Sequence, residues 1–160
     1  MLLLRRKWHS SKLQPEFRFI RSLRSPHHLV FDENLGRYVI SSAAFKPSSG
    51  KDGTLSGDLE QILAFDGLEP TAMYPAVRDP VGAASVTIAE IHAVKATVEH
   101  DPTWRNWYHG AVRGTKSKGA NRQLSKRAKE IIPINQALAA KFDQALKGTT
   151  DGSPSTSLSA

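Results

Sequence analysis

The chain has no cysteine among its 160 residues. This absence excludes disulfides and every zinc or iron site with cysteine ligands, and it is compatible with a reducing, cytoplasmic location. The sequence also has no apolar run near the roughly 20 residues that a membrane-spanning helix needs. We therefore expect a cytoplasmic protein with no membrane partner, whose stability comes from packing alone.

Motifs that fix a reaction or hold a cofactor are missing as well. The segment 114–117 lacks the earlier glycine of a phosphate-binding P-loop, and Ser41-Ser42 has no glycine elbow around it. A metal site would have to use His100, Asp101 and His109, but their spacing matches no known ligand motif. The sequence thus predicts neither a cofactor nor a metal ion.

What the chain does have is a segregated charge. The formal net charge is +7, divided into +6 for residues 1–24, −6 for 25–102, +7 for 103–130 and zero for 131–160. A basic excess gathered into one segment is typical of proteins that bind polyanions. The segment 103–130 is therefore the first candidate for a binding surface.

The composition of this segment favours RNA or single-stranded DNA over a duplex. Its cations and glycines can contact phosphates, and its aromatic rings can stack on unpaired bases. The predicted interface consists of Trp107, Tyr108, Arg113, Lys116, Lys118, Arg122, Lys126 and Arg127. Two alternatives remain open: the aromatic residues belong to the core while the cations form a solvated face, or the basic segment meets an acidic protein partner.

His109 is the candidate catalytic residue. It precedes Gly110 at the start of the basic segment, where a small enzyme acting on a nucleotide or nucleic acid would need a general acid or base, and Asp101 could orient its ring. The alternative is a half-buried strand histidine bonded to the backbone. His27-His28 beside Arg24 form a second polar cluster, for which loop residues are the simpler interpretation.

Periodicity and turn signals predict a single compact α+β domain over residues 15–147, with a small mixed sheet and short helices. Residues 29–40 indicate a β-hairpin, and the strand–helix–strand order over 84–99 indicates a βαβ-like crossover. A basic flexible arm is expected at residues 1–14 and a disordered tail at 148–160. Helices are predicted between Asp58 and Gly67, between Arg122 and Glu130, and between Asn135 and Lys147.

Short blocks of the chain resemble blocks of small uncharacterised bacterial proteins. The blocks are residues 41–45 (Ser-Ser-Ala-Ala-Phe), Leu55-Ser56, Asp101-Pro102 and His109. The resemblance implies a bacterial protein and carries no activity. It also implies that four residues belong to one site or one core: Ser42, Phe45, Ser56 and His109.

Overall fold

The computed structural model describes residues 5–24, 26–48 and 53–150, with residues 149 and 150 described by their backbone alone. Its strands are β1 (Arg18–Arg24), β2 (Leu29–Asp32), β3 (Arg37–Ile40), β4 (Leu55–Leu59), β5 (Pro80–Thr87), β6 (Thr97–His100), β7 (His109–Arg113) and β8 (Lys129–Ile132). Its helices are α1 (Glu60–Phe65), α2 (Ile88–Ala93), α3 (Lys118–Arg127) and α4 (Gln136–Thr150), with short 3-10 helices η1 (Ser10–Lys12), η2 (Ser42–Phe45) and η3 (Tyr74–Ala76). The α+β class expected from the sequence is confirmed.

Six strands form one sheet in the order β6-β7-β4-β1-β5-β8, in which every neighbouring pair is antiparallel. The sheet is therefore antiparallel rather than mixed. β5 and β6 point the same way, as a βαβ unit requires, but β7, β4 and β1 lie between them, so the two strands do not pair. β2 and β3 form a separate antiparallel hairpin, which confirms the hairpin predicted over residues 29–40.

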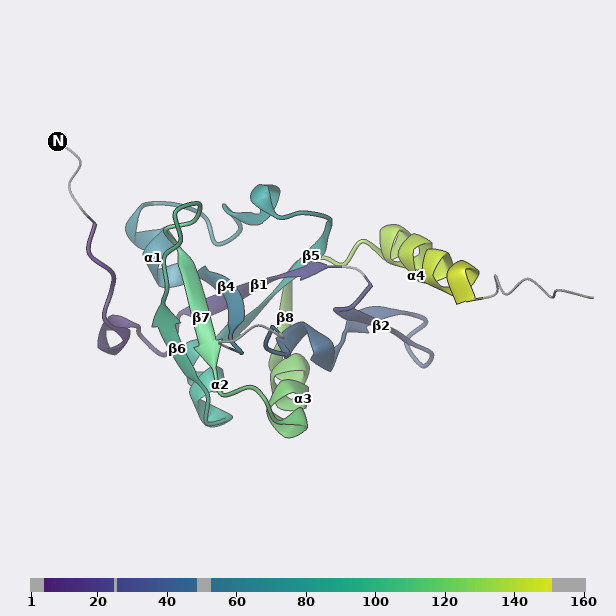
Figure 1. Ribbon diagram of the computed structural model, residues 1–160, viewed down its shortest axis with the longest axis horizontal. Helices are drawn as coiled ribbons and strands as arrows, with labels where there is room; N and C mark the ends of the chain where they lie inside the picture. The colour runs from purple at the N-terminus through teal and green to yellow at the C-terminus, as the bar shows by residue number, and fades with distance from the viewer. Residues whose placement is uncertain (1–4, 25, 49–52, 151–160) are drawn as a thin grey trace, which may run out of the picture.

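The core lies between one face of the six-stranded sheet and the helices η2, α2 and α3 (Figure 1). Side chains alternate between the two faces of a strand, so Phe19 and Leu23 of β1 share this face with Leu59, the register partner of Phe19 on β4. All three are fully buried. The helices contribute further buried side chains to the same cluster: Phe45, Ile91 and Leu124.

Residues 5–14 pack against the domain. The backbone N–H of Trp8 donates to Nδ1 of His100 at 2.8 Å, and Leu13 is buried within the core cluster. Of the flexible arm expected over residues 1–14, residues 5–14 thus contact the rest of the domain, and residues 1–4 lie outside the described residues.

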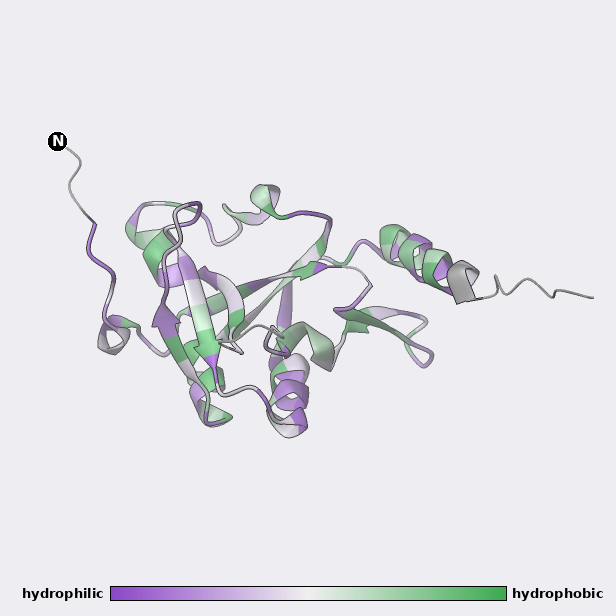
Figure 2. Ribbon diagram, in the orientation of Figure 1, coloured by the Kyte–Doolittle hydropathy of each residue, from purple (hydrophilic) through white to green (hydrophobic). Residues whose placement is uncertain are grey.

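The last helix, α4, packs on the β2–β3 hairpin (Figure 1). The hydroxyl of Tyr38 donates to Asp143 at 2.8 Å, and its backbone N–H donates to Oε1 of Gln136 at 2.7 Å. Hydrophobic and hydrophilic residues alternate around α4, as an amphipathic helix requires (Figure 2). Of the tail expected at 148–160, residues 148–150 continue this helix and the others lie outside the described residues.

Candidate functional site

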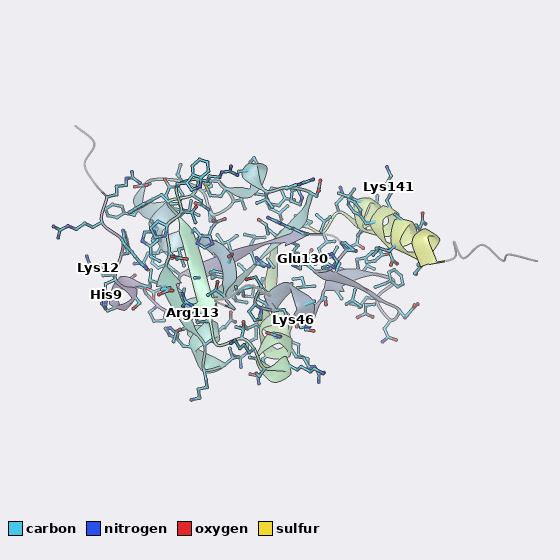
Figure 3. All side chains as sticks on the ribbon, in the orientation of Figure 1. His9, Lys12, Lys46, Arg113, Glu130 and Lys141 are labelled. Atoms are coloured by element: carbon cyan, nitrogen blue, oxygen red, sulfur yellow. The ribbon has the colours of Figure 1, made fainter. Side chains whose placement is uncertain are left out.

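The structure divides the predicted nucleic-acid interface into two groups. Trp107 and Tyr108 precede β7, whereas Lys116 and Lys118 follow it. A strand of this length spans about 13 Å, so the aromatic and basic groups lie at opposite ends of β7. Figure 3 labels Arg113 at the end of the strand from which the chain continues to α3.

The two aromatic residues are already engaged within the protein. The ring of Trp107 lies edge to face with the ring of His100, with 4.8 Å between centroids, and the hydroxyl of Tyr108 donates to Asp66 at 2.8 Å. Both side chains are partly buried against the core. The neighbouring Trp104 is 88% exposed, and the guanidinium of Arg105 lies 4.3 Å from the centroid of its ring.

The basic group is solvent-exposed. Arg113 forms an ion pair with Glu99 at 2.8 Å, whereas no acidic side chain of the described residues pairs with the four cations of α3. These four cations are Lys118, Arg122, Lys126 and Arg127. Lys116 is also exposed in the loop before the helix. Figure 2 shows α3 as a largely hydrophilic element. Its buried residues are Ala120, Asn121 and Leu124.

His109 lies elsewhere, in a cleft between β1 and β4. The two strands pair only at Phe19–Leu59 and Ile20–Asp58, and beyond that point they separate. The space between them is a cleft of about 270 Å³, which the loop before β5 and the loop between β6 and β7 help to line. Its polar lining includes Arg21, Arg24, Ser56, Asp58, Arg105 and His109.

The imidazole of His109 is fixed by the backbone. Its Nδ1 donates to the carbonyl oxygen of Asp101 at 2.6 Å, while the carboxylate of Asp101 lies 3.9 Å away. The sequence predicted that Asp101 could orient this ring. In the structure, the backbone carbonyl of Asp101 does so. Because Nδ1 carries the proton in this arrangement, Nε2 of neutral His109 has a free lone pair and can accept a proton.

Asp58 stands across from His109 on the neighbouring strand, as its register partner. Only 8% of Asp58 is exposed, and its Oδ1 accepts a hydrogen bond from Nδ2 of Asn106 at 2.7 Å. Burial raises the pKa of the Asp58 carboxyl, while the Asn106 hydrogen bond and the charge of His109 oppose that shift. The cleft therefore holds two titratable side chains, those of His109 and Asp58, on neighbouring strands.

Arg21 supplies the main positive charge of the cleft. Its Nε donates to the carbonyl oxygen of Ala44 at 3.1 Å and its Nη1 to that of Ser56 at 2.7 Å. No carboxylate among the described residues pairs with this guanidinium. Burial, and then the charge of Arg24, lower the pKa of Arg21 to about 10, so it remains a cation at neutral pH.

His28 extends this cationic region. Its Nδ1 accepts the backbone N–H of Arg24 at 2.9 Å, and its Nε2 lies 3.5 Å from Nη2 of Arg21. Burial and the charges of Arg21, Arg24 and His27 lower the pKa of His28 to about 4. The ring is therefore neutral at pH 7, and its proton sits on Nε2 because Nδ1 is an acceptor.

Only some of the residues in and beside the cleft were identified from the sequence. His109 was identified by its position, and His28 and Arg24 were noticed as a polar cluster, but Arg21 and Asp58 were not identified as site residues. Of the four residues that the resemblance grouped, the structure brings two into the cleft, Ser56 and His109. Phe45 lies in the core and Ser42 is exposed on η2.

Three further properties of the chain bear on its function. Within the described ranges, no group of three or more His, Asp or Glu side chains is arranged to hold a metal ion. No helix in the part of the chain that the structure describes is both long and apolar enough to cross a membrane. No family model, curated protein or solved structure matches the chain.

Proposed function

We propose that the protein is a small enzyme that binds a phosphorylated ligand of the nucleotide class in the β1–β4 cleft, with His109 as its acid or base. The observation that carries this proposal is the guanidinium of Arg21, which is partly buried, donates to two backbone carbonyls, lies beside neutral His28 and pairs with no carboxylate of the described residues. Three arginines face one carboxyl group among the residues that line the cleft, so an anion would balance the charge.

The size and lining of the cleft limit the ligand. Its volume of about 270 Å³ is near the lower end of the range for ligand pockets, which is roughly 300–1,000 Å³. Met73 and Val77 supply an apolar wall opposite the polar strands. A ligand with a charged phosphate end and a compact, less polar body fits both features.

The fixed tautomer of His109 supports its chemical role. Nε2 has a lone pair that can take a proton from water or from a ligand hydroxyl, and Asp58 is a second titratable group beside it, whose pKa burial raises. Paired groups of this kind serve acid–base catalysis when an anion is held next to them.

Binding is tested with a matched pair of arginine substitutions. We expect a nucleoside monophosphate to raise the Tm of the wild-type protein and of Arg122→Met, which removes an exposed cation of α3, but not that of Arg21→Met. If Arg21→Met does not fold, Arg24→Ala and Arg105→Ala remain, since both side chains are exposed. Each should weaken binding severalfold in calorimetry. Equal binding by all cleft variants would contradict the proposal.

Catalysis is tested separately from binding. The wild-type protein should release product from at least one of p-nitrophenyl phosphate, nucleoside monophosphates and nucleoside 2′,3′-cyclic phosphates, and His109→Gln should lose at least about 100-fold in rate while it still binds the ligand. Turnover that survives in His109→Gln would exclude the acid–base role, although it would leave the binding site in place.

A second candidate function, binding of single-stranded nucleic acid, is favoured by the unpaired cations of α3. Four phosphate contacts predict a log–log salt slope of about −3 with single-stranded RNA. Replacing Lys118, Arg122, Lys126 and Arg127 by alanine should abolish binding, whereas Arg113→Ala should have a small effect because Glu99 already pairs with it. Capture of a protein that survives nuclease treatment would indicate an acidic protein partner instead.

A further inference from the structure

Two hydrogen-bond donors face each other beside the cleft without an acceptor between them. Nη2 of Arg21 lies 3.5 Å from Nε2 of His28. Nδ1 of His28 accepts the backbone N–H of Arg24 at 2.9 Å, so the proton of the neutral ring is on Nε2. Both nitrogens therefore donate, and neither can satisfy the other.

The remaining N–H groups of Arg21 also require a hydrogen-bond acceptor. A guanidinium has five N–H donors in a fixed plane, and Arg21 uses two of them, one on Ala44 and one on Ser56. Three N–H groups remain, together with the N–H of His28. No ion pair within the described part of the chain supplies a carboxylate to either residue.

We infer that Arg21 and His28 form the subsite that holds the doubly charged oxyanion of the ligand, with one of its oxygens bridging Nη2 and Nε2. This inference rests on the proposed function and adds the chemical class of the bound group. A phosphate or sulfate ester has three free oxygens that can accept from four N–H donors at once. A carboxylate has one charge and two oxygens, so it matches the subsite less well.

Such a subsite takes up a proton when it binds a dianion. Burial is the largest cause of the lowered pKa of His28, and the charged or titratable groups that add to it are all cationic or titratable to a cation: Arg21 and Arg24 on β1, and His27 in the turn before β2. A dianion against Nε2 reverses the sign of that local charge and favours the imidazolium. Ligand affinity therefore increases as pH falls toward the pKa of free His28, which is about 4.

Sulfate is the probe that isolates this effect, because it keeps both charges throughout the pH range of the experiment. We would titrate the wild-type protein with sulfate by calorimetry between about pH 7 and about pH 5, in buffers of different ionisation enthalpy. Affinity should increase severalfold on acidification, with uptake of up to about one proton, since one linked proton changes affinity by at most about tenfold per pH unit. Acetate should bind at least about tenfold more weakly.

The matched variant is His28→Gln. A glutamine amide can still accept the backbone N–H of Arg24 and donate toward Arg21, but it cannot titrate. It should bind sulfate at about pH 7 within a few-fold of the wild-type affinity and show neither proton uptake nor stronger binding at low pH. His92→Gln, which replaces an exposed imidazole on α2, should keep the wild-type proton uptake and so separates His28 from a general effect of removing a histidine.

The outcomes are distinguishable. Proton uptake that persists in His28→Gln, or acetate binding as tight as sulfate binding, would overturn the subsite while the cleft remained an anion site. Sulfate binding that is the same at every pH would do so as well. Failure of the wild-type protein to bind sulfate or any phosphorylated ligand would overturn the subsite and the proposed function together.

Discussion

The cleft and the α3 face both carry several cations, yet the two regions differ in what surrounds each charge. Lys118 and Arg122 of α3 stand in solvent, where an unpaired charge costs little and is screened by salt. Arg21 is partly buried between β1 and β4, where a charge without a counterion is destabilising. Unpaired charge is therefore stronger support for a ligand site in the cleft than on α3.

The neighbours of each charge lead to the same conclusion. The cleft arginines come from β1 and from the β6–β7 loop and line one cleft, together with Asp58 and His109. The α3 cations radiate from a single helix, as they would on any solvated helix with a buried apolar side. Substitutions in the two regions can therefore test this contrast.

The same substitution, glycine to alanine, should have opposite effects in the two regions. A Cβ at Gly57 would lie 2.5 Å from the carbonyl oxygen of Ile20 and closer still to the ring of Phe19, so Gly57→Ala should destabilise the protein by about 3 kcal/mol or more. A Cβ at Gly119 in α3 has nothing within 4 Å, so Gly119→Ala should stabilise by about 0.5–1 kcal/mol.

Urea unfolding of both variants measures this pair of effects. An equally mild result for Gly57→Ala would mean that β1 and β4 can move apart at little cost, and that the cleft between them is loosely held. A destabilised Gly119→Ala would show that α3 depends on more than its own helix propensity and its packing against η2.

The hairpin and the last helix could be predicted from the sequence, whereas strand β1, which lines the cleft, could not. The hairpin over residues 29–40 and the last helix follow clear apolar patterns. β1 was not predicted as a strand, because Arg18, Arg21 and Arg24 interrupt the alternation of apolar residues that marks a strand. Arg21 and Arg24, which line the cleft, are therefore among the residues that interrupt the strand pattern of β1 in the sequence.

The helix α3 illustrates a smaller error of the same kind. The helix was expected to begin at Arg122, but it begins at Lys118 with Ser117 as its cap, since the hydroxyl of Ser117 accepts the backbone N–H of Ala120 at 3.1 Å. The helix also ends at Arg127, and the residues after it form β8 along β5. Pairing with a distant strand decides this boundary, and local propensity contains no information on it.

The candidate site was predictable only where its residues have a local signal. His109 stands beside a dense basic segment, so the sequence drew attention to it. Arg21 and Asp58 are 37 positions apart in the chain and meet only because β1 and β4 are neighbours. Charge density along the sequence identified α3, whereas convergence of charge in space identifies the cleft.

The partly buried ring of His28, beside the cleft, should make the protein sensitive to acid. Folding lowers the pKa of His28 to about 4 from the ordinary 6.5, so the folded state binds fewer protons, and stability is lost as pH falls from about 6.5 to 4. After allowance for partial exposure of the ring, the loss is about 2 kcal/mol. His28→Gln should remove it, so the variant should unfold at a lower pH than the wild-type protein in an acid titration followed by circular dichroism.

A control for this titration is His27→Gln, which replaces an exposed imidazole next to His28. It should leave the acid transition within experimental error of the wild-type curve. A shift as large as that of His28→Gln would show that the acid sensitivity is not specific to His28. The acid titration would then no longer support the contrast between buried and exposed groups.

The smallest expected effect tests whether the Asp58 carboxylate already balances the positive charge of the arginines that line the cleft. Burial raises the pKa of its carboxyl, so the folded state holds this proton more tightly than the unfolded state, and the associated stability is lost as pH rises through that raised pKa. Asp58→Asn keeps the shape and can accept from Asn106, so its Tm at about pH 7 should exceed that of the wild-type protein. The difference should disappear toward about pH 3, where the wild-type carboxyl is protonated.

The sign of this result bears on the ligand as well as on stability. Asp79→Asn, on an exposed loop, makes the same chemical change as a control and should alter the Tm less. If Asp58→Asn were instead less stable at about pH 7, the carboxylate would be stabilised by the arginines around it. Arg21 would then have its counterion within the protein, and the argument that the cleft needs an anionic ligand would fail.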